Sequence, residues 1–271
     1  MKKWTDLRRV AKSTALRCLH GNYLKGVIAS LIVFIAGFFA LSFMPLNVPD
    51  TVNYTDPKAL LMSILPEGDI SVTIKLLGIS ILLFLLLSAP LSIGVHRYYI
   101  EVAMSKKAKF STIFTPFLNM GEIFSSCALV ILSTLWKFLV AVVFFALPFA
   151  LLIFSPTLGP LAQIAGFLLY IAAAIFALVF LSPCTMAPFF LAHKPELGAL
   201  RSLILAYKKM RGRKREFLIF DLSFILWRVL FGMSAPGMFF VDPYIYASFA
   251  VFYHFLCAGV ASVDKKQEEA V

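Results

Sequence analysis

Residues 138–192, FLVAVVFFALPFALLIFSPTLGPLAQIAGFLLYIAAAIFALVFLSPCTMAPFFLA, form a run of 55 residues without Asp, Glu, Lys or Arg. A helix needs about 20 apolar residues to cross the hydrocarbon core of a bilayer, so this run is too long for one crossing. Residues 155–160, SPTLGP, interrupt it with two prolines and a glycine, which favour a turn. The run therefore predicts a hairpin of two transmembrane helices, at 138–154 and 161–182.

The composition extends this conclusion to the whole chain. Of its 271 residues, 61% are hydrophobic and only 14% are charged, whereas soluble domains carry about 25% charged residues. A soluble chain of this size could not hide so many apolar side chains, because small domains bury only part of their surface. The formal charge of +11 is a feature of nucleic-acid-binding proteins. Here, however, the basic residues flank apolar segments, so we expect lipid and no nucleic acid as the surroundings.

Hydropathy along the rest of the chain predicts four further crossings, and hence an all-α polytopic membrane protein in a single domain. The six expected spans are residues 26–44, 76–95, 138–154, 161–182, 217–233 and 238–260. The segments assigned to the cytoplasm hold 21 of the 25 Lys and Arg residues, and those assigned to the outside hold 2. Because cytoplasmic loops carry the excess of basic residues, this bias predicts a cell-membrane protein with both termini in the cytoplasm.

Two amphipathic basic helices are expected at the cytoplasmic face. The first covers residues 5–20, and Gly21 can end it. This helix either lies flat on an anionic leaflet or packs on the protein's own loops. The second covers residues 195–211 and runs into the basic segment 208–215, KKMRGRKR. The basic residues of this segment are Lys208, Lys209, Arg211, Arg213, Lys214 and Arg215. Such clusters attract anionic lipid head groups at about 1 kcal/mol per residue, although they can also serve only to fix the topology.

Residues 120–136 are expected to form an interfacial or half-embedded helix before the third span. Their apolar part, 123–136, has 14 residues, which is short for a crossing. If it were the span, Lys137 would lie near mid-bilayer at a cost of several kcal/mol. We therefore expect Trp136 and Lys137 at the inner boundary, where an indole and a snorkelling ammonium group are both favourable. The alternative is a functional lysine buried in the membrane.

Motifs in the last third of the chain resemble those of a bacterial family. Residues 208–227, KKMRGRKREFLIFDLSFILW, join a basic Met-x-Gly segment to Leu-Ser-Phe-x-x-Trp, and residues 241–253, VDPYIYASFAVFY, contain Pro-Tyr and Phe-Tyr. Together with HGNY at 20–23 and the segment 94–117, these motifs are similar to those of the domain of unknown function 975 family. The resemblance implies an integral membrane protein of uncharacterised function, and it supplies no activity.

Two ionisable residues remain inside the fifth expected span, Asp221 and Arg228. They are seven residues apart and share a helix face, but about 10 Å of axial rise separates them, which is too far for a direct pair without a third group. An intramembrane charge is a functional-site hypothesis by default, so the two could line a polar path. In the structural alternative, Asp221 pairs with Arg215 or caps buried backbone. Arg228 then snorkels or bonds to Asp242 or to a backbone carbonyl.

The sixth expected span is rich in aromatic residues. Tyr246, Phe249 and Tyr253 recur at helical spacing, next to Tyr244 and Phe252. We expect this set to pack against the fifth span, and ligand stacking is the alternative.

The sequence contains no pattern typical of catalysis or metal binding. Its four Cys and four His residues are scattered, and it has no P-loop, GxSxG or HExxH motif. We therefore expect no enzyme activity, no cofactor and no metal. The favoured hypothesis is a non-enzymatic accessory, regulatory or lipid-interacting membrane protein, which contacts anionic head groups and is compatible with a protein partner in the membrane. The alternative is a transporter or channel that uses Asp221 and Arg228.

Overall fold

The computed structural model describes residues 2–43, 70–105, 108–232 and 235–258, and every element within these ranges is a helix. The chain begins with α1 (Lys2–Leu19), which covers the first expected amphipathic helix. Gly21 follows with a φ of 86°, a left-handed conformation that favours glycine, and α2 (Tyr23–Leu41) then starts in a new direction. The expected end of the first helix at Gly21 is confirmed.

Four described helices are long and apolar enough to cross a membrane, so the chain has the helices of a membrane protein, but the expected count of six spans is not confirmed. The four comprise α2, a continuous helix through Ser71–Met104, most of α6 (Met120–Leu158), and α7 (Pro160–His193). The second of them consists of α4 (Ile70–Leu83), the π turn η1 (Phe84–Ser88) and α5 (Ala89–Ser105). Pro90 explains the π turn, because its ring would clash with the carbonyl group four residues earlier in a regular helix.

The hairpin predicted from the uncharged run is present. Gly159, with a φ of 91°, separates the end of α6 from Pro160, which opens α7. Proline is favourable at a first helical position, where its missing N–H group costs no helical hydrogen bond. Residues 120–136 are helical, as expected, and continue without a break into the third expected span as the first part of α6. The 39 residues of α6 span about 58 Å, roughly twice the hydrocarbon thickness of a bilayer.

The fifth expected span, 217–233, is divided. It falls on α9 (Lys214–Leu222) and α10 (Ile225–Gly232), which a turn at Ser223 and Phe224 separates. With nine and eight residues, each helix is shorter than a crossing requires. The sixth expected span falls on α11 (Ala235–Ala258).

The core of the protein is built around α11. The rings of Phe217 and Phe220 in α9 lie 5.2–5.9 Å from those of Phe249 and Phe252 in α11. Phe249, Phe252 and Tyr244 therefore pack against the segment before the last helix, as expected. Tyr246 and Tyr253 differ from the expectation, because Tyr246 contacts α5 and Tyr253 contacts α7. On another side of α11 lies α1, whose small buried residues contact the protein and not lipid. These residues are Ala11, Ala15 and Cys18.

Short helices complete the core. The 3-10 helix η2 (Phe110–Leu118) packs along α5, and η3 (Pro195–Leu197) leads into α8 (Gly198–Lys209). The second expected amphipathic helix, 195–211, thus consists of η3 and α8, and α8 lies against the core ends of α6 and α7.

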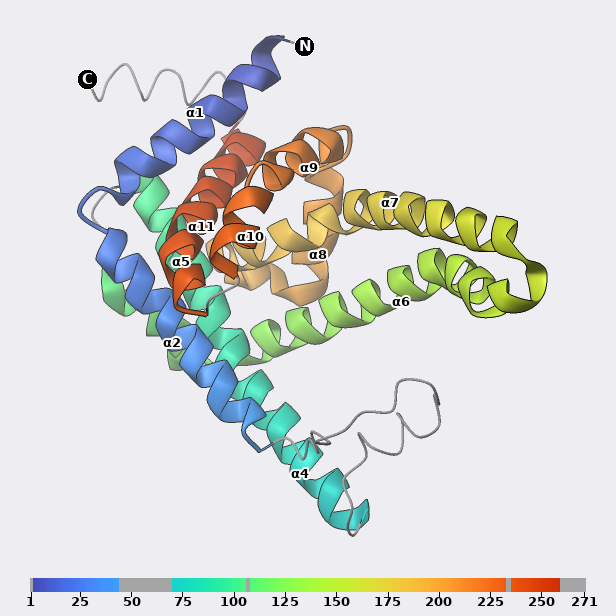
Figure 1. Cartoon of the computed structure of the whole chain (residues 1–271). Helices are drawn as coiled ribbons and strands as arrows, with labels where there is room; N and C mark the ends of the chain where they lie inside the picture. The colour runs from blue at the N-terminus through green and yellow to red at the C-terminus, as the bar shows by residue number, and fades with distance from the viewer. Residues whose placement is uncertain (1, 44–69, 106–107, 233–234, 259–271) are drawn as a thin grey trace.

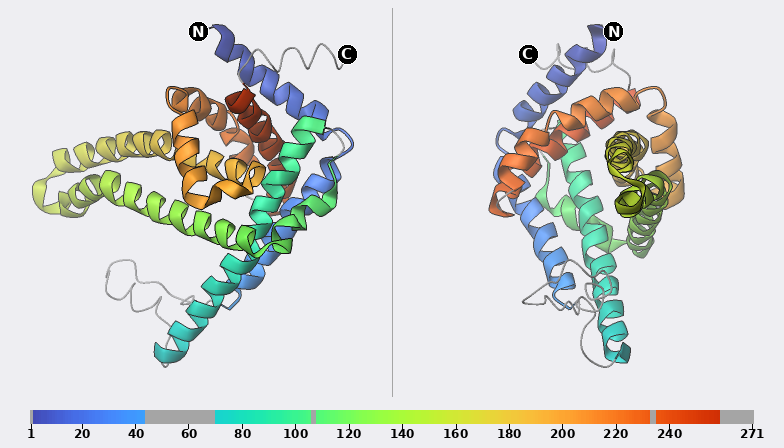
Figure 2. Two further views of the ribbon diagram at one scale, coloured as in Figure 1. Left: turned by 180° about the vertical axis from the view of Figure 1, so that it is seen from behind. Right: turned by 45° about the vertical axis from the view of Figure 1, so that its right-hand side comes forward.

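Two helix pairs extend from this core in different directions, α2 with α4 and α6 with α7 (Figures 1 and 2). Their surfaces are apolar, and large side chains are mostly exposed. Examples are Phe38 in α2, Phe138 in α6 and Phe176 in α7, which are 64–67% exposed. Soluble monomers rarely expose contiguous apolar surface on this scale, so both pairs require lipid or another apolar cover.

Candidate functional site

The two charged residues singled out in the fifth expected span lie in contact. Nη2 of Arg228 is 2.8 Å from Oδ1 of Asp221, and their side chains are 38% and 25% exposed. The expectation that these residues are too far apart to pair was wrong, because it assumed an unbroken helix. At the break, the Phe224 N–H group donates to the carbonyl of Asp221, and the Arg228 N–H group donates to the carbonyl of Phe224. The helix axis therefore changes direction between Asp221 and Arg228, which brings their side chains into contact.

Asp242 of α11 belongs to the same polar region, since Arg228 acts electrostatically on its carboxylate. This is one neighbour that the structural alternative gave to Arg228, whereas Asp221 pairs with Arg228 and not with Arg215. Asp242 also lines a small cavity of about 60 Å³ between α2, α5 and α11. Neither Asp221 nor Arg228 lines that cavity.

The cavity beside Asp242 has both polar and apolar residues in its wall and has room for a few water molecules. Ser30 of α2, Ser92 and His96 of α5, and Tyr246 of α11 contribute to its wall. Nδ1 of His96 lies 2.6 Å from the carbonyl oxygen of Ser92. A carbonyl only accepts hydrogen bonds, so Nδ1 carries the proton and Nε2 is left as an acceptor. An acid, Asp242, and a base, His96, thus line the same cavity.

The basic segment 208–215 forms the connection between α8 and α9, where Gly212 has a φ of 81°. Four of its six basic residues are exposed on the surface. These are Lys208, Lys209, Arg211 and Arg215. Lys214 is held differently, because its Nζ atom lies 4.9 Å from the ring centroid of Phe180 and 5.1 Å from that of Tyr207. The structure therefore brings this segment to the place where the α6–α7 hairpin leaves the core.

An aromatic cluster marks the same place. The indole N–H of Trp136 donates to the hydroxyl of Tyr207, and the Trp136 ring stacks on Phe180 with centroids 5.9 Å apart. The Tyr207 hydroxyl donates in turn to the carbonyl of Phe180 at 3.0 Å. Burial raises the pKa of Tyr207, so its hydroxyl keeps the proton that this bond needs. Tryptophan and tyrosine at such a level are typical of a membrane interface.

The length of α6 beyond Trp136 and Lys137 is close to the thickness of a bilayer core. Lys137, next to Trp136, is exposed. From residue 138 to the end of α6 there are 21 residues, or about 32 Å, which is close to the thickness of the hydrocarbon core. A segment of bilayer length therefore follows Lys137.

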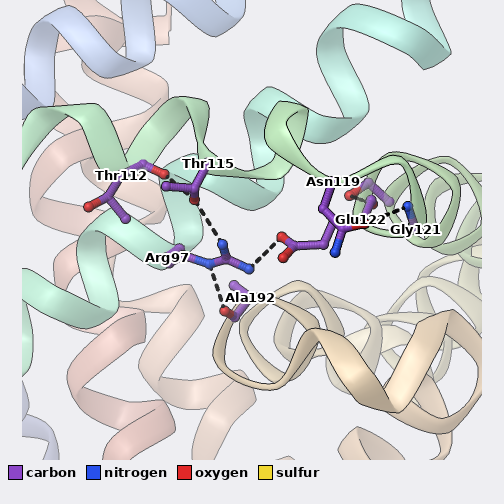
Figure 3. Close-up of polar contacts among 8 residues, drawn as sticks. Arg97, Thr112, Thr115, Asn119, Gly121, Glu122 and Ala192 are labelled. Carbon is purple, nitrogen blue, oxygen red and sulfur yellow. Dashed lines mark hydrogen bonds and ion pairs between the residues drawn. The ribbon is translucent and has the colours of Figure 1, made fainter.

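A second polar centre was not found by sequence reasoning (Figure 3). Arg97 of α5 donates to Oε2 of Glu122 at 2.7 Å, to Oγ1 of Thr115 at 2.8 Å and to the carbonyl of Ala192 at 3.0 Å. The side chains of Arg97 and Glu122 are 19% and 18% exposed. Arg97 therefore joins α5 to η2, to the start of α6 and to the end of α7.

Helix dipoles favour both charges at this centre. Glu122 lies in the first turn of α6, where a negative charge is stabilised, and Arg97 contacts the last turn of α7, where a positive charge is stabilised. Asn119 completes the start of α6 by accepting a hydrogen bond from the N–H group of Gly121. The sequence offered no signal for this centre, because its members are 18 to 95 residues apart.

A family model matches residues 1–258, which include all described residues of the chain. The family is described as "Protein of unknown function (DUF975)", in agreement with the resemblance of the sequence motifs. Searches of curated proteins and of solved structures found no match. The chain therefore belongs to the DUF975 family of membrane-type proteins of unknown function.

Proposed function

We propose that this DUF975 protein is a multi-pass protein of the cell membrane that acts by contact at the inner leaflet, without catalysis. Four crossings by α2, α4–α5, α6 and α7 leave both termini on the same side, in agreement with the distribution of Lys and Arg. In this arrangement α9, α10 and α11 belong to a helical core at the cytoplasmic face.

One observation carries the proposal. The basic segment lies where the apolar α6–α7 hairpin leaves the core, and Lys214 packs directly on rings of that level. Basic residues at this height of a membrane protein attract anionic head groups. The exposed apolar row of α10 supports the same view, because a short helix with such a face inserts into an interface. Leu226, Val229 and Leu230 in this row are 58–63% exposed.

Cysteine labelling in intact cells tests the topology. Single cysteines are placed in a cysteine-free chain at Ser234, at Lys209 and at Asn53, which the sequence assigns to the outside. A membrane-impermeant maleimide should label position 53 and leave positions 209 and 234 unlabelled. Labelling of position 234 would restore the six-span arrangement, and labelling of position 209 would reverse the orientation.

Lipid selectivity tests the contact function. Spin-labelled phosphatidylglycerol and phosphatidylcholine are compared in vesicles that contain the protein. We expect the anionic lipid to associate about threefold more strongly or better, since each basic residue contributes up to about 1 kcal/mol before screening. Arg211→Gln/Arg215→Gln should reduce this preference more than the matched pair Arg9→Gln/Arg17→Gln on α1. Equal association of both lipids with the wild-type protein would contradict the proposal.

Transport is the second candidate, and the cavity that Asp242 and His96 share is the observation in its favour. Asp221 and Arg228 contribute indirectly, because Arg228 pairs with Asp221 and acts electrostatically on Asp242. Vesicles that hold a pH-sensitive dye report proton flux under an imposed gradient. Transport requires a flux above that of protein-free vesicles and its loss in Asp242→Asn. An unchanged flux in the wild-type vesicles removes this candidate.

A further inference from the structure

We infer that the groove between α6 and α8 binds one acyl chain of an anionic phospholipid, whose phosphate group lies at Lys137 and Lys214. The inference rests on the proposed contact with the inner leaflet and adds a defined site to it. The site lies outside the polar cavity and outside the Arg97 centre.

The groove has a volume of about 430 Å³, within the range of about 300–1,000 Å³ that is usual for ligand sites. Its walls are almost wholly apolar. Leu132, Leu135 and Leu139 of α6 form one wall, and Leu200 and Ile204 of α8 contribute to the other. An aliphatic chain suits such a surface, because it can fill the groove with van der Waals contacts and no polar group in the groove demands a partner.

Trp136 and Tyr207 belong to the lining of the groove and hydrogen-bond to each other across it. Because they join α6 to α8 at this point, they fix the width of the groove. Their polar atoms are satisfied by each other and by the carbonyl of Phe180, so they present ring surface to an occupant.

Two lysines give the site its charge. Lys214 lies over the rings of Phe180 and Tyr207, and Lys137 follows Trp136 on α6. Tyr207 and Trp136 both line the groove, so each lysine adjoins one residue of its wall. Within the part of the chain that the structure describes, neither lysine forms an ion pair with a carboxylate.

These features select the occupant. An apolar groove alone would accept any aliphatic chain, and a cationic cluster alone would accept any anion. Their adjacency favours a molecule with both parts, and the bilayer supplies anionic phospholipids at high local concentration. A zwitterionic lipid fits the groove equally well but gains less from two lysines.

Quenching of Trp136 by brominated lipids tests the inference in reconstituted full-length protein. The chain has three tryptophans, so Trp4→Phe/Trp227→Phe leaves Trp136 as the reporter. The control Trp4→Phe/Trp136→Phe leaves Trp227, which is 45% exposed on α10. Brominated phosphatidylglycerol should half-quench Trp136 at a mole fraction about tenfold lower than brominated phosphatidylcholine does, as two lysines imply after screening. Trp227 should be quenched by both lipids alike.

Two variants separate the groove from the rest of the surface. Lys137→Gln/Lys214→Gln should abolish the preference at Trp136, and Arg211→Gln/Arg215→Gln should preserve it. Ile204→Phe narrows the groove at a 56% exposed position without a change of charge, and it should weaken quenching by both lipids. Equal quenching of Trp136 by both lipids overturns the inference, even if spin-labelled lipids still show a preference elsewhere. A preference that only Arg211→Gln/Arg215→Gln removes also overturns it, while the proposed contact at the inner leaflet stands.

Discussion

Arg97 is the residue on which α5, η2, α6 and α7 converge. Its guanidinium group donates hydrogen bonds to a carboxylate, a hydroxyl and a backbone carbonyl in three different elements. Lysine could not reproduce this contact, because its ammonium group lacks the planar fork of donors. The chain of hydrogen bonds continues from Thr115 to the carbonyl of Thr112, whose hydroxyl donates to Glu101. The base of the α6–α7 hairpin is thus fixed by polar contacts within an apolar protein.

Removal of either charge at this centre should be costly. We expect Arg97→Met to lower the free energy of unfolding in detergent by about 3–5 kcal/mol, because Glu122 is left mostly buried without its partner. The double variant Arg97→Met/Glu122→Met should cost less than the sum of the two single variants. Denaturant titration of all four proteins measures this coupling. Additive losses would show that the pair does not act as a unit.

Gly94 permits the close contact of α5 with η2. A Cβ atom at this position would lie 1.9 Å from the carbonyl oxygen of Ile113. Gly94→Ala should therefore destabilise the protein by about 1–3 kcal/mol or more. Gly78→Ala is the control, since nothing lies within 4 Å of its added Cβ, and alanine should stabilise this helix by up to about 1 kcal/mol. Thermal unfolding of both variants measures these effects. Equal unfolding midpoints would contradict the close contact between Gly94 and Ile113.

At the scale of helices, the sequence predicted those turns and helix ends that glycine and proline set locally. Gly159 and Pro160 mark the hairpin turn, and Gly21 marks the end of α1, because these residues act on their own backbone. The break at Ser223 and Phe224 has no such marker. Phe224 is fully buried, with its ring against Phe220 and Phe249 and with the Lys12 ammonium group 4.3 Å from its centroid. Tertiary contacts position this turn, so periodicity along the sequence placed Asp221 and Arg228 too far apart.

If the packing of Phe224 holds the turn, substitutions around it should differ in their effect on the free energy of unfolding. Phe224→Ala should lower the free energy of unfolding by about 3–5 kcal/mol, as for other buried aromatic residues. Arg228→Gln should cost about 1 kcal/mol or less, because the ion pair with Asp221 is more than one-quarter exposed on the arginine side. Denaturant titration of the two variants provides the comparison. A larger loss in Arg228→Gln would mean that the ion pair, and not the packing of Phe224, holds the turn.

At the scale of the whole molecule, the chain combines a compact core with two apolar helix pairs that leave it in different directions (Figure 1). Hydropathy detects apolar helices but does not distinguish lipid from protein as the surrounding. Most of α11 is buried in the core. In the most apolar 18 residues of α6 and of α7, only 11% and 17% of the residues are buried. The composition therefore predicted a membrane protein, and the division between core and projecting pairs needed the three-dimensional contacts.

The proposed inner boundary of the membrane at Lys137 of α6 can be tested by placing a charge on either side of it. Val143 lies beyond Lys137 and is 67% exposed, and Phe124 lies before it and is 70% exposed. A lysine at position 143 would lie about 9 Å inside the hydrocarbon core, where a charge is unfavourable, by up to about 2.5–3.5 kcal/mol at the helix centre. Val143→Lys should therefore reduce the yield of membrane-inserted protein severalfold, whereas Phe124→Lys should leave it nearly unchanged. Because the two sites are alike in exposure and lie on one helix, an equal effect of both lysines would move the boundary away from Lys137.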